Sequence, residues 1–155
     1  TCEEVWQCLG FKTSVHLESW PKLETGRRDA ELEAKWERLL ETRDKVLKAL
    51  EASREKKEIG NSLEAEVELS VSKSDEAEFL GSFKQDLPGL LLVSHVSVAT
   101  LPAQKAGVPG GEDESLRVAV KRARGVKCER CWKILPDVGT HSHAGNCARC
   151  DEALS

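Results

Sequence analysis

Four cysteines near the end of the chain are the feature that most constrains its fold. They form two Cys-x-x-Cys pairs, Cys128 with Cys131 and Cys147 with Cys150, and fifteen residues separate the two pairs. This pattern is typical of a structural site for one tetrahedral zinc ion, because each pair can turn as a tight knuckle and offer two thiolates. We therefore expect one structural zinc ion, with disulfides or free thiols as the alternatives.

Four thiolates would fill the coordination shell, so a catalytic metal with an open position for water is not expected. A module of about 30 residues has too small an apolar core to fold alone, and the metal would therefore contribute to its folding. His141 and His143 lie between the two pairs. Either is an alternative ligand, although we expect both to be exposed. Cys2 and Cys8 lie outside the set and are interpreted as small apolar residues on a short helix.

Length and composition limit the class of protein to which the chain can belong. The chain has 155 residues, enough for one ordinary domain or two small ones, and it contains no Met. We therefore interpret it as a piece of a longer protein. No segment reaches the roughly 20 apolar residues of a membrane helix, and no signal-peptide layout is present. The paired cysteines favour a reducing compartment over a secreted disulfide scaffold.

The longest predicted element is an amphipathic helix from about Ala30 to Glu58. Apolar residues recur there at steps of three and four, which places them on one face. Asp29 is expected to cap the start of the helix, and Gly60 is expected to end it. The apolar face consists of Leu32, Trp36, Leu39, Leu40, Val46, Leu47 and Leu50.

After this helix the pattern changes to that of a small mixed subdomain. Alternation of apolar and polar residues predicts strands, and an apolar run predicts a buried one. Asp75 is expected to cap a short helix. The predicted elements are a strand at 65–71, a helix at 76–82, a buried strand at 90–99, a loop at 102–115 and a third strand at 116–121.

The predicted fold class is α+β. It comprises a long amphipathic helix, a small mixed β/α subdomain and a C-terminal four-cysteine zinc ribbon or finger. The predicted domain limits are 1–25 for the end of a helical region, 26–123 for the long helix with the subdomain, and 124–155 for the zinc finger. Few residues separate the third strand from Cys128, so we expect the zinc module to pack against that strand.

Basic charge is concentrated where the chain enters the zinc module. Residues 117–133 carry seven basic residues against one acidic residue, whereas residues 1–116 carry 15 basic and 23 acidic residues. Such a block is typical of a phosphate-binding surface, with an ordinary solvated surface as the equal alternative. Trp132 follows Cys131 and either stacks on a base or covers the knuckle as a small core. The candidate nucleic-acid contacts are Arg122, Arg124, Lys127, Arg130, Trp132 and Lys133.

Catalytic motifs were not found in the sequence. There is no Walker loop, no G-x-S-x-G and no H-E-x-x-H. The four histidines have no evident nucleophile or carboxylate set around them.

Four stretches of the chain carry a resemblance to a known family. They are Glu4–Trp6 with Ser14–Pro21, Trp36–Glu51, Ile59–Ala65, and Lys127–Trp132 with Asp137–Gly139 and Cys147–Cys150. Together they resemble the C-terminal region of a bacterial-type isoleucyl-tRNA synthetase, meaning its anticodon-binding tail and zinc finger. The resemblance covers nearly the whole chain, and Ile59–Ala65 and the zinc finger are its most specific parts.

This resemblance implies a role in holding tRNA. The parent enzyme attaches isoleucine to tRNA(Ile) using ATP, and its catalytic parts lie upstream, so the fragment itself is expected to be non-catalytic. Arg130 and Trp132 would contact the anticodon region, which makes stacking by Trp132 the favoured interpretation. The implied partners are tRNA(Ile) and the rest of the synthetase chain, and the implied cofactor is one structural zinc ion. The protein is expected to be monomeric and cytoplasmic.

Two alternative functions stay open at this point. A related four-cysteine finger ends DNA-repair glycosylases of the formamidopyrimidine type. Those enzymes need an N-terminal Pro where this chain has Thr1, and a long acidic helix fits them poorly. The other alternative is a purely structural zinc ribbon that braces its parent protein.

Overall fold

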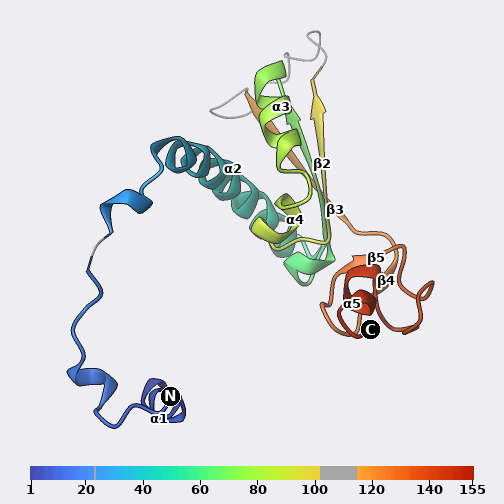
Figure 1. The fold of residues 1–155 in the computed structure, drawn as a ribbon. Coiled ribbons are helices and arrows are strands. Elements are labelled where there is room, and N and C mark those ends of the chain that lie inside the picture. Colours follow the sequence, from blue (N-terminus) through green and yellow to red (C-terminus); the bar gives the residue numbers. More distant parts are fainter. Residues whose placement is uncertain (23, 102–114) are drawn as a thin grey trace. The chain divides into compact units, whose positions relative to one another are not determined.

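The computed structural model describes residues 1–22, 24–101 and 115–155 (Figure 1). Most of the predicted 102–115 loop therefore lies outside the described residues. The chain divides into two compact units, Thr1–Glu33 and Ala34–Ser155. Within the described ranges, every helix is too short or too polar to cross a membrane.

The first unit begins with short helical segments. Helix α1 spans Cys2–Cys8, and 3₁₀ turns follow at η1 (Val15–Leu17) and η2 (Thr25–Arg27). The Trp6 ring stacks on Phe11 with centroids 3.9 Å apart, and its Nε1 donates to Thr13 O at 2.9 Å. Cys2 and Cys8 both lie on α1, as expected, and both are exposed. They are therefore not packed as apolar residues in the structure described.

Helix α2 spans Ala30–Glu55 and is capped at its start as predicted. Asp29 Oδ1 accepts hydrogen bonds from the backbone N–H groups of Glu31 and Leu32, at 3.1 and 3.0 Å. These bonds satisfy donors that have no partner inside the helix.

The end of α2 differs from the prediction. We expected the helix to reach Glu58 and to stop at Gly60, but it ends at Glu55. Lys57 adopts a left-handed conformation with φ 61°. Lys57 N donates to Arg54 O at 2.9 Å, and Glu58 N donates to Ser53 O at 3.0 Å. This is the Schellman pattern, with lysine at the position that glycine usually takes.

A three-stranded mixed sheet forms the centre of the second unit. Its order is β2-β1-β3, where β1 is Ala65–Val71, β2 is His95–Thr100 and β3 is Leu116–Arg122. Strand β2 runs parallel to β1, and β3 runs antiparallel to it. The parallel pair is joined through helices α3 (Ser74–Ser82) and α4 (Leu87–Leu90). A short 3₁₀ turn, η3 (Ser62–Glu64), precedes β1.

Two predicted boundaries in this region are wrong. Helix α3 begins at Ser74 with Lys73 as its N-cap residue, not at 76 with Asp75 as the cap. The run that we expected to be a strand from 90 begins instead as the end of α4, and β2 starts at His95. Pro88 lies in the first turn of α4, where its fixed φ favours a helix start. A short apolar run alone does not distinguish a strand from a helix end.

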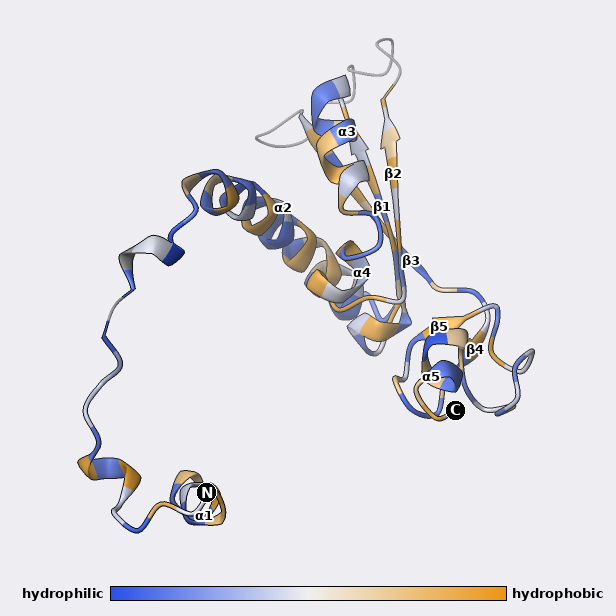
Figure 2. Ribbon diagram, viewed as in Figure 1, coloured by the Kyte–Doolittle hydropathy of each residue, from blue (hydrophilic) through white to orange (hydrophobic). Residues whose placement is uncertain are grey.

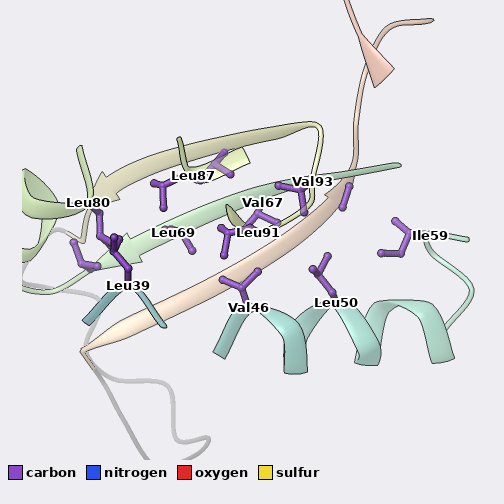
Figure 3. Packing of buried hydrophobic residues seen from close by; sticks show 13 residues of the cluster. Leu39, Val46, Leu50, Ile59, Val67, Leu69, Leu80, Leu87, Leu91 and Val93 are labelled. Atoms are coloured by element: carbon purple, nitrogen blue, oxygen red, sulfur yellow. The ribbon is translucent and has the colours of Figure 1, made fainter. Parts of the chain in front are cut away.

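The main core lies between α2, the sheet and the α3–α4 connection (Figure 3). Val46 and Leu50 of α2 point toward Val67 and Leu69 of β1, which are fully buried. Figure 2 shows hydrophobic and hydrophilic stretches alternating along α2. The buried face of α2 is narrower than the predicted stripe. Leu32, Trp36, Leu40 and Leu47 remain exposed, whereas Leu39, Val46 and Leu50 are buried.

The C-terminal module follows β3 directly. It contains a two-stranded hairpin, β4 (Val126–Lys127) with β5 (Ile134–Leu135), and helix α5 (Ala148–Glu152). We expected this module to pack against the third strand. That packing stays a prediction, and among the described residues a hydrogen bond joins the module to Ser94, just before β2. The buried Ser94 hydroxyl donates to Leu63 O and accepts from Ile134 N, the latter at 2.7 Å.

The left-handed backbone conformation of Lys57 leads to a prediction about stability. Lys57→Gly should raise the free energy of unfolding by about 0.5–1 kcal/mol, because glycine adopts positive φ without the Cβ clash. Lys56→Gly, one residue earlier and without a positive φ, should lower it by a similar amount. Urea unfolding of the 155-residue chain, followed by circular dichroism, measures both. A loss of stability in both variants would contradict the prediction.

Candidate metal centre and nucleic-acid interface

The four predicted cysteines converge on one point of the C-terminal module. Their sulfur atoms all lie within 4.8 Å of one another, and Cys128, Cys147 and Cys150 are buried. None of the four forms a disulfide. The Sγ atoms of Cys131 and Cys147 are 3.8 Å apart. A tetrahedron with metal–sulfur bonds of about 2.3 Å has edges of about 3.8 Å, so the cluster fits one four-coordinate ion.

The first knuckle is built on the β4–β5 hairpin. Cys128 N donates to Lys133 O, and Trp132 N donates to Cys128 O, both at 2.9 Å. These bonds close a tight turn in which Trp132 adopts φ 65°. The turn brings Cys128 and Cys131 to the same side, which is why two residues must separate them.

The second knuckle is built on helix α5. Cys147 is the N-cap residue of this helix, and Cys150 N donates to Cys147 O at 2.9 Å. Glu129 N donates to Gly145 O at 2.9 Å and so ties the first knuckle to the segment that leads into the second. The two pairs are therefore held together by the backbone as well as by the sulfur atoms.

The surroundings of the thiols favour ionisation of Cys128 and oppose ionisation of Cys131 and Cys147. Burial disfavours ionisation of Cys128, but N–H groups of Cys131, Cys147 and Arg130 outweigh it and lower the pKa of Cys128 to about 6. One of these is Cys147 N, 3.5 Å from Cys128 Sγ. Burial raises the pKa of Cys147 to about 12 and also raises the pKa of Cys131. A bound cation would supply the positive charge that these thiols lack.

The two histidines between the cysteine pairs contact carboxylates. His141 Nε2 lies 3.1 Å from Asp137 Oδ2, which also accepts from Ala148 N at 2.8 Å. The Ala148 N–H group is the main cause of the lowered pKa of Asp137. His143 binds Asp151 Oδ1 through its backbone N–H and its Nδ1, both at 2.7 Å. Among the described residues, the candidate metal cluster includes neither histidine.

Trp132 projects from the first knuckle into solvent. Its exposed fraction is 60%, and Lys127 Nζ lies 5.8 Å from the centre of its ring. The buried core of the module consists of Val138, Cys128, Cys147 and Cys150, with Cys131 and Leu135 packed against it. Trp132 therefore does not cover the knuckle as a core residue, which was one of the two interpretations of the sequence.

The other candidate RNA contacts differ in their surroundings. Arg122, the last residue of β3, and Arg124, between β3 and β4, are exposed, and Lys133 is half-buried after the knuckle. Arg130 is exposed as a whole residue, yet its Nη1 lies 3.8 Å from Cys150 Sγ. The structure thus brings Lys127 and Trp132 together and directs Arg130 toward the sulfur cluster.

Several residues that shape the site were missed in the sequence. Asp137 and Asp151 hold the second knuckle through Ala148 and His143. Gly125 has φ 126°, and a Cβ atom there would lie 2.3 Å from Leu135 O. A lone glycine before a Cys-x-x-Cys pair was the available signal, since a hairpin entering a knuckle often needs a conformation that only glycine adopts.

Comparison with known proteins gives the family. A family model described as "Anticodon-binding domain of tRNA ligase" matches residues 1–69. The isoleucine–tRNA ligase of Moorella thermoacetica is 39% identical over 160 residues, which cover 97% of this chain and 17% of that protein. The corresponding ligase of Ruegeria pomeroyi is 40% identical over 156 residues, covering 99% of this chain and 16% of that protein.

The chain belongs to the isoleucine–tRNA ligase family, as a C-terminal segment. The resemblance found in the sequence is thereby confirmed. The ligase of Desulforamulus reducens is similar in the same way, with 41% identity over 155 residues, 97% of this chain and 16% of that protein. The chain thus spans about one sixth of the length of the curated relatives that it matches.

Gly125 generates the prediction for this module. Gly125→Ala should open the hairpin, because its Cβ would overlap the Leu135 carbonyl in a backbone conformation that costs about 1–3 kcal/mol for other residues. Gly139→Ala is the matched control. Gly139 also has positive φ, 96°, but its Cβ would meet only Ala144 O at 3.7 Å.

Hydrogen–deuterium exchange of peptides within 126–150 measures this effect. Gly125→Ala should exchange at least about tenfold faster than the parent chain, and Gly139→Ala should exchange only a few-fold faster. Equal rates in the two variants would contradict a steric role for Gly125.

Proposed function

We propose that this chain is the tRNA-recognition segment of an isoleucine–tRNA ligase, which attaches isoleucine to tRNA(Ile) with ATP. The segment holds the anticodon stem-loop, and the chemistry takes place elsewhere in the longer protein. The observation that carries this proposal is the similarity of nearly the whole chain to isoleucine–tRNA ligases, with the anticodon-binding model over residues 1–69.

We propose zinc as the metal of the cysteine cluster. Four thiolates form a soft donor set that is typical of structural zinc, and the sulfur spacing fits its bond length. Once bound, the ion supplies positive charge and links the two knuckles. Cys128, Cys131, Cys147 and Cys150 would all be ligands, leaving no open position. Free thiols of this kind require a reducing compartment, which supports a cytoplasmic location.

The knuckle would present Trp132 to an unpaired base. Its ring is exposed, and Lys127 lies near it, so one side chain can stack while the other reaches a neighbouring phosphate. Arg122, Arg124 and Lys133 extend the positive charge on either side of the knuckle. Unpaired bases occur in the anticodon loop, which is why this surface suits the stem-loop better than a bare duplex.

ATP and the amino acid belong to the remaining part of the ligase in this proposal. The partners of the segment are tRNA(Ile) and the rest of its own chain, and the ligase acts as a monomer. The glycosylase alternative is not favoured, because the relatives that match along the chain are tRNA ligases. A purely structural zinc ribbon is the remaining alternative, and the binding test below distinguishes it from an RNA-binding finger.

Metal content tests the first part of the proposal. The 155-residue chain purified under reducing conditions should carry about one zinc per molecule by elemental analysis. Cys150→Ser should lose most of the zinc, because one of the buried sulfurs disappears. Cys8→Ser should retain it, since Cys8 lies on α1 outside the cluster. Equal zinc content in both variants would contradict the assigned site.

Binding of the anticodon stem-loop tests the second part. Trp132→Ala should weaken binding by about 5- to 100-fold, since base stacking contributes about 1–3 kcal/mol. Trp132→Phe should retain most of the affinity, because its ring can still stack. Binding to a duplex of the same length should change little.

Charge variants provide the control for the same assay. Lys127→Ala should weaken binding to any RNA and lower the salt slope by about one unit. Lys84→Ala, just after α3, should have no effect. Equal losses for stem-loop and duplex in Trp132→Ala would rule out stacking. Unchanged binding in both Trp132→Ala and Lys127→Ala would leave the purely structural ribbon.

A further inference from the structure

Arg130 has an environment that RNA binding does not explain. It occupies the third position of the first Cys-x-x-Cys pair, yet its Nη1 reaches Cys150 Sγ of the second pair at 3.8 Å. That distance is within hydrogen-bond range for a sulfur acceptor. The guanidinium therefore spans the two knuckles.

The second pair offers an internal comparison. Arg149 occupies the same third position between Cys147 and Cys150, on helix α5. Arg149 is exposed. The guanidinium that contacts Cys150 Sγ is that of Arg130. The two arginines are thus matched in sequence context and in charge and differ in their position at the cluster.

The electrostatics of a loaded cluster explain why such a contact matters. One zinc ion with four thiolates has a net charge of about −2 in a place where Cys128 and Cys150 are fully buried. Asp137 and Asp151, which hold the second knuckle, add further negative charge nearby. Cys128 receives backbone N–H groups, including that of Cys147. For Cys150, the contacting charged donor is Arg130.

We propose that Arg130 is a positioning residue of the metal centre. Its guanidinium donates to the Cys150 thiolate, offsets the charge of the zinc–thiolate cluster and slows release of the ion. This inference rests on the zinc site of the proposed function and removes Arg130 from the set of RNA contacts. A guanidinium committed to sulfur keeps the knuckles closed, while Lys127 and Trp132 face the RNA.

Zinc release from the loaded 155-residue chain tests the proposal. Arg130→Gln should lower zinc affinity, and speed zinc transfer to a chromogenic chelator, by about 10- to 100-fold, as expected when a group that supports a metal ligand is removed. Arg149→Gln should match the parent chain in both measurements. Arg130→Lys should fall between them, because lysine keeps the charge without the planar donor group.

Cobalt substitution gives a signal that a general loss of stability would not produce. Removing a hydrogen bond makes the thiolate more electron-rich, so the thiolate-to-cobalt charge-transfer band should move to longer wavelength in Arg130→Gln. In Arg149→Gln the band should stay in place. If Arg130→Gln cannot be loaded, the comparison is made with Arg130→Lys, which should show a smaller shift.

Stem-loop binding at saturating zinc separates the two roles of Arg130. We expect Arg130→Gln and Arg149→Gln to have the same affinity for the anticodon stem-loop. Parent-like zinc release in Arg130→Gln, or a loss of stem-loop affinity confined to Arg130→Gln, would overturn this inference alone. A parent chain that binds no zinc would instead overturn the metal site of the proposed function.

Discussion

The convergence of four sulfur atoms is the constraint on which the C-terminal module depends. Three of the four cysteines are buried, and burial raises the pKa values of Cys131 and Cys147. Such a cluster is unfavourable as a set of anions and becomes favourable when a cation joins it. The turn that directs the sulfurs inward also directs Trp132 outward. The site and the exposed ring are thus two sides of one backbone conformation.

Local patterns in the sequence were enough for much of the fold. The Asp29 cap, the alternation of buried residues in β1 and the strand at β3 all depend on neighbours along the chain. The errors arose where a local pattern fits more than one structure. The apolar run before His95 was divided between α4 and a turn, and α2 ended in a left-handed lysine without glycine. Pro88 favours a helix start within the apolar run, and the Schellman bonds at the end of α2 form without the glycine that usually marks them.

The candidate site, too, was predictable from the sequence in some features and not in others. The cysteine spacing predicted the sulfur cluster, and the family followed from motifs such as Ile59–Ala65. The role of Arg130 could not be read from the sequence, because Arg149 has the same local context. The contact of Arg130 Nη1 with Cys150 Sγ of the other pair distinguishes the two arginines. The exposure of Trp132 likewise required knowledge of which residues fill the small core.

The Ser94 hydroxyl has a consequence for the whole second unit. It joins the segment before β1 to the β4–β5 hairpin, which carries the first knuckle. A metal that orders the hairpin therefore also supports the Ser94 bond that joins the hairpin to the sheet. Metal binding is then linked to the unfolding equilibrium of both the hairpin and the sheet. The melting temperature of the sheet would then depend on free metal concentration.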